Sequence, residues 1–136
     1  MDQYVAIAHY SEHQTGLGID ITNSEYLAEN CWKFGFVRRY QEDKVSVTHT
    51  SNEKWHYRYV GILHAKFMTE QNLCLEEYID LLHTKTQEDP LMIDGVRVFH
   101  IPEDGNVVVP VGTAVVFSGD NVDGYVVSMI LPNVGE

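Results

Sequence analysis

Ser11-Glu-His-Gln-Thr-Gly-Leu-Gly-Ile-Asp20 is the most informative stretch of this chain, together with Glu53-Lys-Trp-His56 further on. Together the two stretches contain two histidines, one aspartate and a glutamate three residues before the second histidine. Two imidazoles and one carboxylate are what a catalytic zinc ion needs, because three protein ligands leave the fourth tetrahedral position open for water. A nearby glutamate can take a proton from that water. We therefore predict a zinc-dependent peptidase.

Three residues are the predicted metal ligands: His13, Asp20 and His56. Residues 17–21 alternate between apolar side chains and glycine or aspartate, which predicts a strand with its carboxylate pointing away from the apolar side. A turn at Thr15-Gly16, followed by this strand, would bring the first two ligands to one point.

Glu53 is the predicted general base, and its spacing to His56 constrains the local structure. Residues three apart face opposite sides of a regular strand. We therefore expect Glu53 on the loop before a strand, with a break near Lys54 that lets both side chains face the metal. The preceding Thr50-Ser-Asn52 favours a turn at this point.

Other chemistries fit the sequence less well. Two histidines and a carboxylate also bind iron in non-haem oxygenases, but those usually take their first two ligands from almost adjacent positions on one strand. The chain has no G-x-S-x-G elbow and no phosphate-cradling glycine loop. The other histidines are interpreted as ordinary core or surface residues: His9, His49, His64, His83 and His100.

Composition limits the classes of protein to consider. The chain has 136 residues, room for one modest domain or a small domain with an appendage, and 44% hydrophobic residues are enough for a packed core. A formal net charge of −11 argues against a nucleic-acid partner, whose phosphates require clustered Lys and Arg. We expect no membrane span, since no apolar run approaches about 20 residues, and no signal peptide. Two cysteines, Cys31 and Cys74, make no disulfide framework.

Secondary-structure patterns divide the chain into two parts. The first mixes predicted helices, over 24–34, 62–71 and 75–83, with predicted strands over 17–21, 36–40, 45–49 and 55–60. From Pro90 onward helix signals are absent, and β-branched runs predict strands over 96–101, 107–111, 114–117 and 125–131. We therefore expect an α+β fold over residues 1–89, a small antiparallel sheet with flanking helices, and a small all-β module over 90–136.

The two motifs resemble those of the VanY-type D-alanyl-D-alanine carboxypeptidases, which belong to the LAS group of zinc peptidases. The group's first motif, S-x-H-x-x-G-x-A-x-D, is matched from Ser11 to Asp20, with Gly18 in place of alanine. The second motif, E-x-W-H, is matched from Glu53 to His56. The resemblance covers roughly residues 9–82 and implies a LAS or hedgehog-like peptidase core.

The resemblance implies a role for each matched position. The implied zinc ligands are His13, Asp20 and His56, and Glu53 would be the catalytic base. Ser11 would help to bind the terminal carboxylate of the substrate, and Trp55 would shape the site. Two arginines at family positions, Arg39 and Arg58, are expected to be structural partners of carboxylates.

The chain also departs from the family pattern at its beginning. Family members have a long N-terminal portion with an arginine that stabilises the transition state, whereas here no arginine precedes the first motif. We therefore expect a domain that lacks the N-terminal part of the catalytic domain, with exposed apolar surface that invites self-association. A smaller departure is Cys74, which stands where relatives often have a threonine helix cap.

The expected function is that of a zinc-dependent D,D-carboxypeptidase acting on peptidoglycan stem peptides or precursors that end in D-Ala-D-Ala. Two alternatives remain open. One is a non-catalytic domain that binds zinc or cell-wall peptide, and the other is a D,D-dipeptidase or endopeptidase of the same family. Relatives act outside the bacterial cytoplasm, so the resemblance implies a location in the cell envelope.

Overall fold

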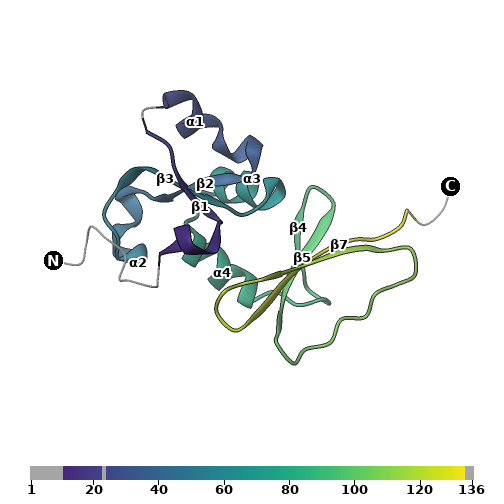
Figure 1. The fold of residues 1–136 in the computed structure, drawn as a ribbon. Helices are drawn as coiled ribbons and strands as arrows, with labels where there is room; N and C mark the ends of the chain where they lie inside the picture. Colours follow the sequence, from purple (N-terminus) through teal and green to yellow (C-terminus); the bar gives the residue numbers. More distant parts are fainter. Residues whose placement is uncertain (1–10, 23, 134–136) are drawn as a thin grey trace. The chain divides into compact units, whose positions relative to one another are not determined.

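The computed structural model describes residues 11–22 and 24–133, and the chain divides into two compact units, residues 1–77 and 78–136 (Figure 1). Each unit has its own antiparallel sheet, with strand order β1-β3-β2 in the first and β4-β5-β7-β6 in the second. The fold class is therefore α+β, as the sequence predicted. Within the described ranges, no helix has the length and apolar character needed to cross a membrane.

The first unit is built on a three-stranded sheet with β3 (Glu53–Tyr59) between β1 (Gly18–Asp20) and β2 (Phe36–Tyr40) (Figure 1). The helical segments around it are η1 (Glu12–Thr15), α1 (Glu25–Asn30), η2 (Cys31–Phe34), η3 (Glu42–Lys44), α2 (Val45–Thr48) and α3 (Ile62–Glu70). Helix α3 packs against β2 and η2. The buried apolar residues of this unit are Cys31, Val37, Tyr57, Ala65, Met68 and Cys74. Both cysteines are free.

The helix expected over 24–34 is divided into two segments. Ser24 caps α1, since its hydroxyl accepts a hydrogen bond from the backbone N–H of Leu27 at 3.0 Å. The chain then tightens into the 3₁₀ turn η2 and ends at Gly35, whose φ of 84° suits glycine. Because a 3₁₀ helix has three residues per turn instead of 3.6, the side chains of η2 point in other directions than an α-helix would give them, and Phe34 is 53% exposed. Asn23, which is also a residue type that favours the N-cap of a helix, lies outside the described residues.

The strand expected over 45–49 is wrong, because these residues form α2 and its cap. The helix follows directly from η3, where Glu42 and Asp43 lie in the first turn and favour a helical start. His49 ends the turn with a φ of 56°, and its N–H donates to the carbonyl of Val45 at 2.9 Å. An alternation of apolar and polar residues over so short a stretch also fits one helical turn.

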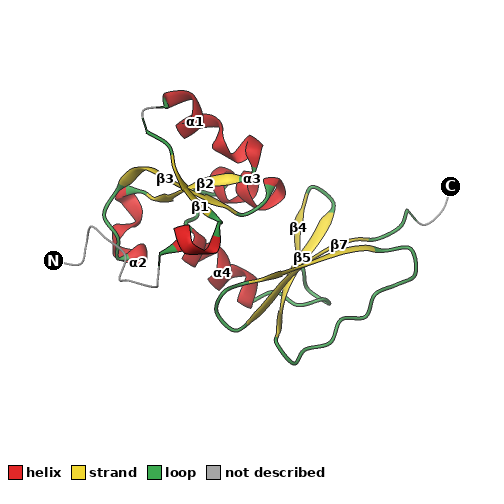
Figure 2. Cartoon of the chain, viewed as in Figure 1, coloured by secondary structure: helices red, strands yellow, loops and turns green. Residues whose placement is uncertain are grey.

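The second unit consists of two hairpins joined through their inner strands. One hairpin is β4 (Leu91–Ile93) with β5 (Val96–Pro102), the other is β6 (Ala114–Gly119) with β7 (Gly124–Ile130), and β5 pairs with β7. The core of the sheet is formed by Phe99, Val127 and Met129. Helix α4 (Leu75–His83) leads into this unit, and Figure 2 shows strands and loops in the described residues after it.

Two expectations for the second unit need correction. Residues 107–111 form a loop instead of a strand, because Pro110 has no N–H for a ladder and Gly112 turns the chain with a φ of 83°. Val111 in this loop is 98% exposed. Strand β4 was not expected, since three residues are too few for a period to be recognised.

Candidate metal centre

The candidate centre begins with the pairing of β1 and β3, which sets Asp20 directly opposite His56. Side chains of directly opposed residues lie on the same face of an antiparallel pair. The distance from His56 Nδ1 to Asp20 Oδ1 is 3.4 Å. The imidazole of His56 is buried, whereas the carboxylate of Asp20 is about half exposed. The site is therefore anchored in the sheet and open on one side.

The third residue, His13, comes from the short helical turn η1. This turn ends at Gly16, whose φ of 75° reverses the chain into β1, as the sequence predicted for Thr15-Gly16. The distance from His13 Nε2 to Asp20 Oδ1 is 3.1 Å, and the rings of His13 and His56 meet edge to face at 4.7 Å. The three candidate ligand atoms lie within 4.8 Å of one another. The structure thus brings together the three residues that the motifs singled out.

The remaining nitrogen of each imidazole has a partner that fixes the ring. His13 Nδ1 lies 3.1 Å from the carbonyl oxygen of Gly18, and His56 Nε2 lies 3.0 Å from Glu12 Oε2. If these nitrogens donate to their acceptors, the lone pairs of His13 Nε2 and His56 Nδ1 face Asp20. Such partners are what orients histidines in metal sites. The donor set and its orientation therefore fit a metal ion with two nitrogen ligands and one oxygen ligand.

Sequence reasoning did not single out Glu12, which supports His56 from a buried position. Its Oε1 accepts hydrogen bonds from Arg39 Nε at 2.6 Å and from Arg58 Nη1 at 2.8 Å. Burial alone would raise the pKa of Glu12, but the hydrogen bond with His56 and the two guanidinium charges lower it to about 2. Arg39 also pairs with Glu76. Both Arg39 and Arg58 thus pair with carboxylates, as expected from the sequence.

Glu53 lies beside the candidate ligands, although not in the way that was expected. It is the first residue of β3 and pairs with Tyr40, instead of lying on a loop before the strand. Between this pair and the Arg38–Tyr57 pair the register shifts, so that the regular alternation of β3 is interrupted. This irregularity allows Glu53 and His56 to face one site, with Glu53 Oε2 3.6 Å from His56 Nδ1.

The carboxyl group of Glu53 has a perturbed pKa. Burial raises the pKa of Glu53, the imidazole of His56 opposes this effect, and the negative charge of Asp20 adds to it. Its side chain is only 14% exposed. A carboxylate whose pKa is raised towards the working pH is a better general base than one in free solution.

The two residues assigned to substrate binding lie next to the centre along the chain. The hydroxyl of Ser11 accepts a hydrogen bond from the N–H of His13 at 3.3 Å, so that Ser11 caps η1. Trp55 precedes His56 in β3 and is 43% exposed. The roles of Ser11 and Trp55 in substrate binding remain predictions.

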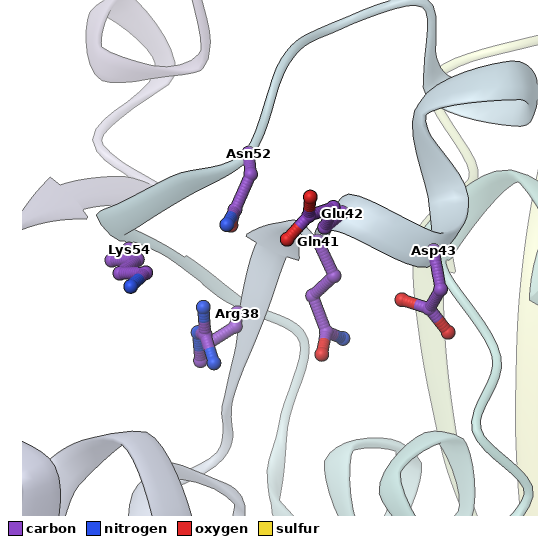
Figure 3. Close-up of a pocket in the computed structure, with 6 residues that line it drawn as sticks. All are labelled: Arg38, Gln41, Glu42, Asp43, Asn52 and Lys54. Carbon is purple, nitrogen blue, oxygen red and sulfur yellow. The ribbon is translucent and has the colours of Figure 1, made fainter.

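A separate polar hollow lies elsewhere on the first unit (Figure 3). Its volume is about 500 Å³, and its walls are formed by Arg38, Gln41, Glu42, Asp43, Asn52 and Lys54. Two of its atoms, Arg38 Nε and Asn52 Oδ1, are buried without a hydrogen-bond partner among the described residues. None of the candidate metal ligands lines this hollow.

Comparisons with known proteins agree with the motifs and the fold. Residues 1–62 match the model of the VanY family, described as D-alanyl-D-alanine carboxypeptidase. A D-alanyl-D-alanine carboxypeptidase of Enterococcus faecium is 37% identical over 140 residues, which cover 93% of this chain and 46% of the relative. A D-alanyl-D-alanine carboxypeptidase of Enterococcus faecalis is 48% identical over 89 residues, covering 58% of this chain and 33% of the relative.

Two solved structures are similar as well. The vancomycin resistance D,D-dipeptidase VanXYg, solved with a D-Ala-D-Ala phosphinate analog, has a TM-score of 0.81 at 28% identity, covering 93% of this chain and 61% of that chain. A mutant of the D,D-pentapeptidase VanY, solved in complex with Zn(II), has a TM-score of 0.54 at 46% identity. The match covers 57% of this chain and 49% of that chain. The chain thus shares the fold of the LAS-type peptidases. In sequence it is similar to the VanY family over residues 1–62, and the chain spans less than half of the length of the two enterococcal carboxypeptidases.

Proposed function

We propose that this chain carries the zinc-binding and proton-transfer residues of a D,D-carboxypeptidase. The observation that supports this proposal most strongly is the convergence of His13, Asp20 and His56 on one point, with the carboxylate of Glu53 beside them. Three ligands and an adjacent base are the set that a hydrolytic zinc site requires. The relative solved with Zn(II) supports zinc as the metal.

The residues around the proposed centre would have two roles, metal binding and proton transfer. His13 Nε2, His56 Nδ1 and a carboxylate oxygen of Asp20 would hold the ion. A zinc ion bound there would polarise the scissile carbonyl and lower the pKa of its water towards about 7. Glu53 would accept a proton from the attacking water and return it to the amine that leaves. Its raised pKa, caused first by burial, makes this carboxylate a stronger base than one in free solution.

The proposed substrate is a peptidoglycan stem peptide or precursor that ends in D-Ala-D-Ala. The names of the relatives support this class of substrate. Ser11 would help to bind its terminal carboxylate, and Trp55 would form a wall of the site. Because the resemblance is to peptidases that act outside the bacterial cytoplasm, we also propose the cell envelope as the location. Fractionation of producing cells tests that location, and recovery in the cytoplasmic fraction alone would refute it.

The experiment that tests the function replaces the proposed base. Glu53→Gln keeps the size of the side chain and removes its ability to accept a proton. We expect release of D-alanine from an acyl-D-Ala-D-Ala peptide to fall by at least about 100-fold, while bound zinc stays unchanged. Glu29→Gln, an exposed change on α1, is the matched control and should keep the activity of the parent. Activity of Glu53→Gln near that of the parent would contradict the role of Glu53.

A second candidate, D,D-dipeptidase activity, is favoured by the likeness to VanXYg, which extends over 93% of this chain. The two activities differ in the length of the accepted substrate. Free D-Ala-D-Ala and an acylated peptide with the same ending therefore distinguish them. Cleavage of the free dipeptide alone would favour a dipeptidase. Binding of zinc and peptide without cleavage of either would favour the non-catalytic alternative.

A further inference from the structure

A second group of histidines and carboxylates lies in the second unit. His83 is the last residue of α4 and His100 lies in β5, while Asp120 and Asp123 lie in the turn between β6 and β7. Each of the four offers one ligand atom, and these atoms lie within 4.8 Å of one another. Both histidines were interpreted from the sequence as ordinary residues. Their partners are 20 or more positions away in the chain, so that no local motif indicated the group.

The distances within this cluster describe a closed arrangement of two nitrogens and two oxygens. His83 Nε2 lies 3.2 Å from Asp120 Oδ2 and 3.2 Å from Asp123 Oδ1. His100 Nε2 lies 2.9 Å and 3.4 Å from the same two oxygens. Tetrahedral zinc with bonds of about 2.0–2.1 Å has ligand atoms about 3.3 Å apart. The four nitrogen–oxygen distances are close to that value.

Hydrogen bonding alone accounts poorly for this geometry. Asp120 Oδ1 already accepts the backbone N–H groups of Val122, Asp123 and Gly124 at 2.8–3.1 Å. Its Oδ2 faces both imidazole nitrogens, and each of these nitrogens also faces Asp123. A single imidazole N–H group cannot form well-aligned hydrogen bonds to the oxygens of both Asp120 and Asp123 at once. A cation between the four atoms would satisfy all of them.

The surrounding structure holds the ligand atoms in place. The side chain of Asp120 is fully buried and that of His100 is 12% exposed. A Cβ at Gly124 would lie 2.8 Å from His100 Nε2 and would clash with the carbonyl oxygen of Ile101, so glycine leaves room for this ring. The side chains of His83 and Asp123 are 30% and 65% exposed, which gives an ion a path from solvent.

The cluster also repeats the arrangement of the candidate centre in the first unit. In both, two imidazole rings meet edge to face at an interplanar angle of 74°, with centroids 4.7 Å apart in the first and 4.2 Å apart in the second. In both, the two rings share a carboxylate oxygen. The second cluster differs by a second carboxylate, which fills the fourth position of a tetrahedron.

We propose that His83, His100, Asp120 and Asp123 bind a second zinc ion, with a structural role. Four protein ligands leave no open position for water, which is the usual difference between structural and catalytic zinc sites. The ion would fix the end of α4 to β5 and to the β6–β7 turn within the second unit. This inference does not depend on the proposed enzymatic activity.

The test uses the full chain in which the first centre has been removed by His13→Ala and His56→Ala. Titration of this variant with Zn²⁺ should give one bound ion per chain and a higher melting temperature. Co²⁺ in its place should give the visible absorption of a tetrahedral ion. Adding His83→Ala should weaken the binding of Zn²⁺ by at least about 100-fold, since even loss of an outer partner costs 10–100-fold.

Matched carboxylate variants keep the test decisive if the histidine variant folds poorly. Asp123→Asn removes a proposed ligand from an exposed turn, whereas Asp104→Asn removes the same charge from an exposed position outside the cluster. We expect weaker binding of Zn²⁺ only for Asp123→Asn. Asp120 is unsuitable for this purpose, because it also holds the turn through three backbone groups. Equal affinity of the Asp123→Asn and Asp104→Asn proteins for Zn²⁺, or no uptake by the chain without the first centre, would overturn the proposal.

Discussion

Glu12 shows how much of the candidate centre depends on a residue that would not touch the metal. One of its carboxylate oxygens fixes His56, and the other accepts from two buried arginines. This arrangement keeps Glu12 ionised and directs Nδ1 of His56 towards Asp20. Outer partners of this kind raise the basicity of a ligand and limit the movement of its ring.

We predict that Glu12→Gln weakens the binding of zinc at the first centre by about 10–100-fold. The amide is a weaker acceptor than the carboxylate, and it leaves Arg39 and Arg58 with less compensation for their burial. Competition between the protein and a chelator of known affinity measures the effect. Glu29→Gln serves as the control. An unchanged affinity in the Glu12→Gln protein would show that the hydrogen bond to His56 does not support the site.

The sequence indicated some residues of the two clusters and not others, and the reason is physical. His13, Asp20 and His56 stand in short motifs whose spacing suggests their chemistry. Glu12 lies inside the first motif, but its partners are 27, 44 and 46 positions away. Long-range pairing of that kind leaves no local pattern. The same holds for His83 and His100, whose shared partner Asp120 comes later in the chain.

At the scale of elements, the beginning of α4 shows an incomplete capping arrangement. The side chain of Glu77 accepts a hydrogen bond from the N–H of Cys74 at 2.9 Å and pairs with Lys44 at 2.8 Å. In a complete capping box the residue at position 74 would return a hydrogen bond through a hydroxyl. Cysteine is a poor substitute for that group.

We predict that Cys74→Thr stabilises the protein by about 0.5–1 kcal/mol, because it restores the second hydrogen bond of the box. Urea denaturation measures the free energy of unfolding. Cys74→Ala, which supplies no hydroxyl, is the control and should give no gain. A loss of stability in the threonine variant would mean that the buried hydroxyl finds no partner.

Glu77 makes the stability of the same element depend on pH. The hydrogen bond with Lys44, followed by that with Cys74, lowers the pKa of Glu77 below its ordinary value. A carboxyl group with a lowered pKa in the folded state contributes stability above its unfolded pKa and loses it as the pH falls through the folded pKa. Glu77→Gln should therefore destabilise the protein by about 0.5–1.5 kcal/mol at pH 7 and by less near pH 3. An equal loss at both pH values would contradict this explanation.

The elements that the sequence predicted well are those with a clear local period. The strand over 36–40 and the helix over 75–83 have the expected bounds, because each has several residues of one repeat and a defined end. Residues 45–49 and 107–111 were misassigned because β-branched residues also occur in single helical turns and loops. The position of Glu53 depended on a register shift between β2 and β3, which single-strand alternation cannot reveal.

At the scale of the whole molecule, each of the two units has its own sheet and its own cluster of histidines and carboxylates. The sequence predicted two parts from the change in composition near Pro90, and a boundary between residues 89 and 90 remains a prediction. Small units bury little apolar surface and benefit from bound metal. Metal ions would therefore matter for stability as well as for activity.

We predict that removal of metal by a chelator lowers the melting temperature of the protein. Ligand at 100 times its dissociation constant stabilises a folded unit by about 2.7 kcal/mol, which corresponds to a shift of about 10 °C or more in units of this size. Thermal unfolding with excess zinc and with chelator measures the shift, and readdition of zinc should reverse it. A chain whose melting temperature does not respond to either treatment would contradict both proposed sites.

The most direct test of the central claim is the zinc content of the purified chain, compared with that of a His13→Ala/His56→Ala variant after the same dialysis. The proposed first centre predicts that the variant contains one zinc ion per chain fewer than the parent. Because the comparison is a difference, it does not depend on the second site. Equal zinc contents in the two folded proteins would contradict the assignment of His13, Asp20 and His56 as a metal centre.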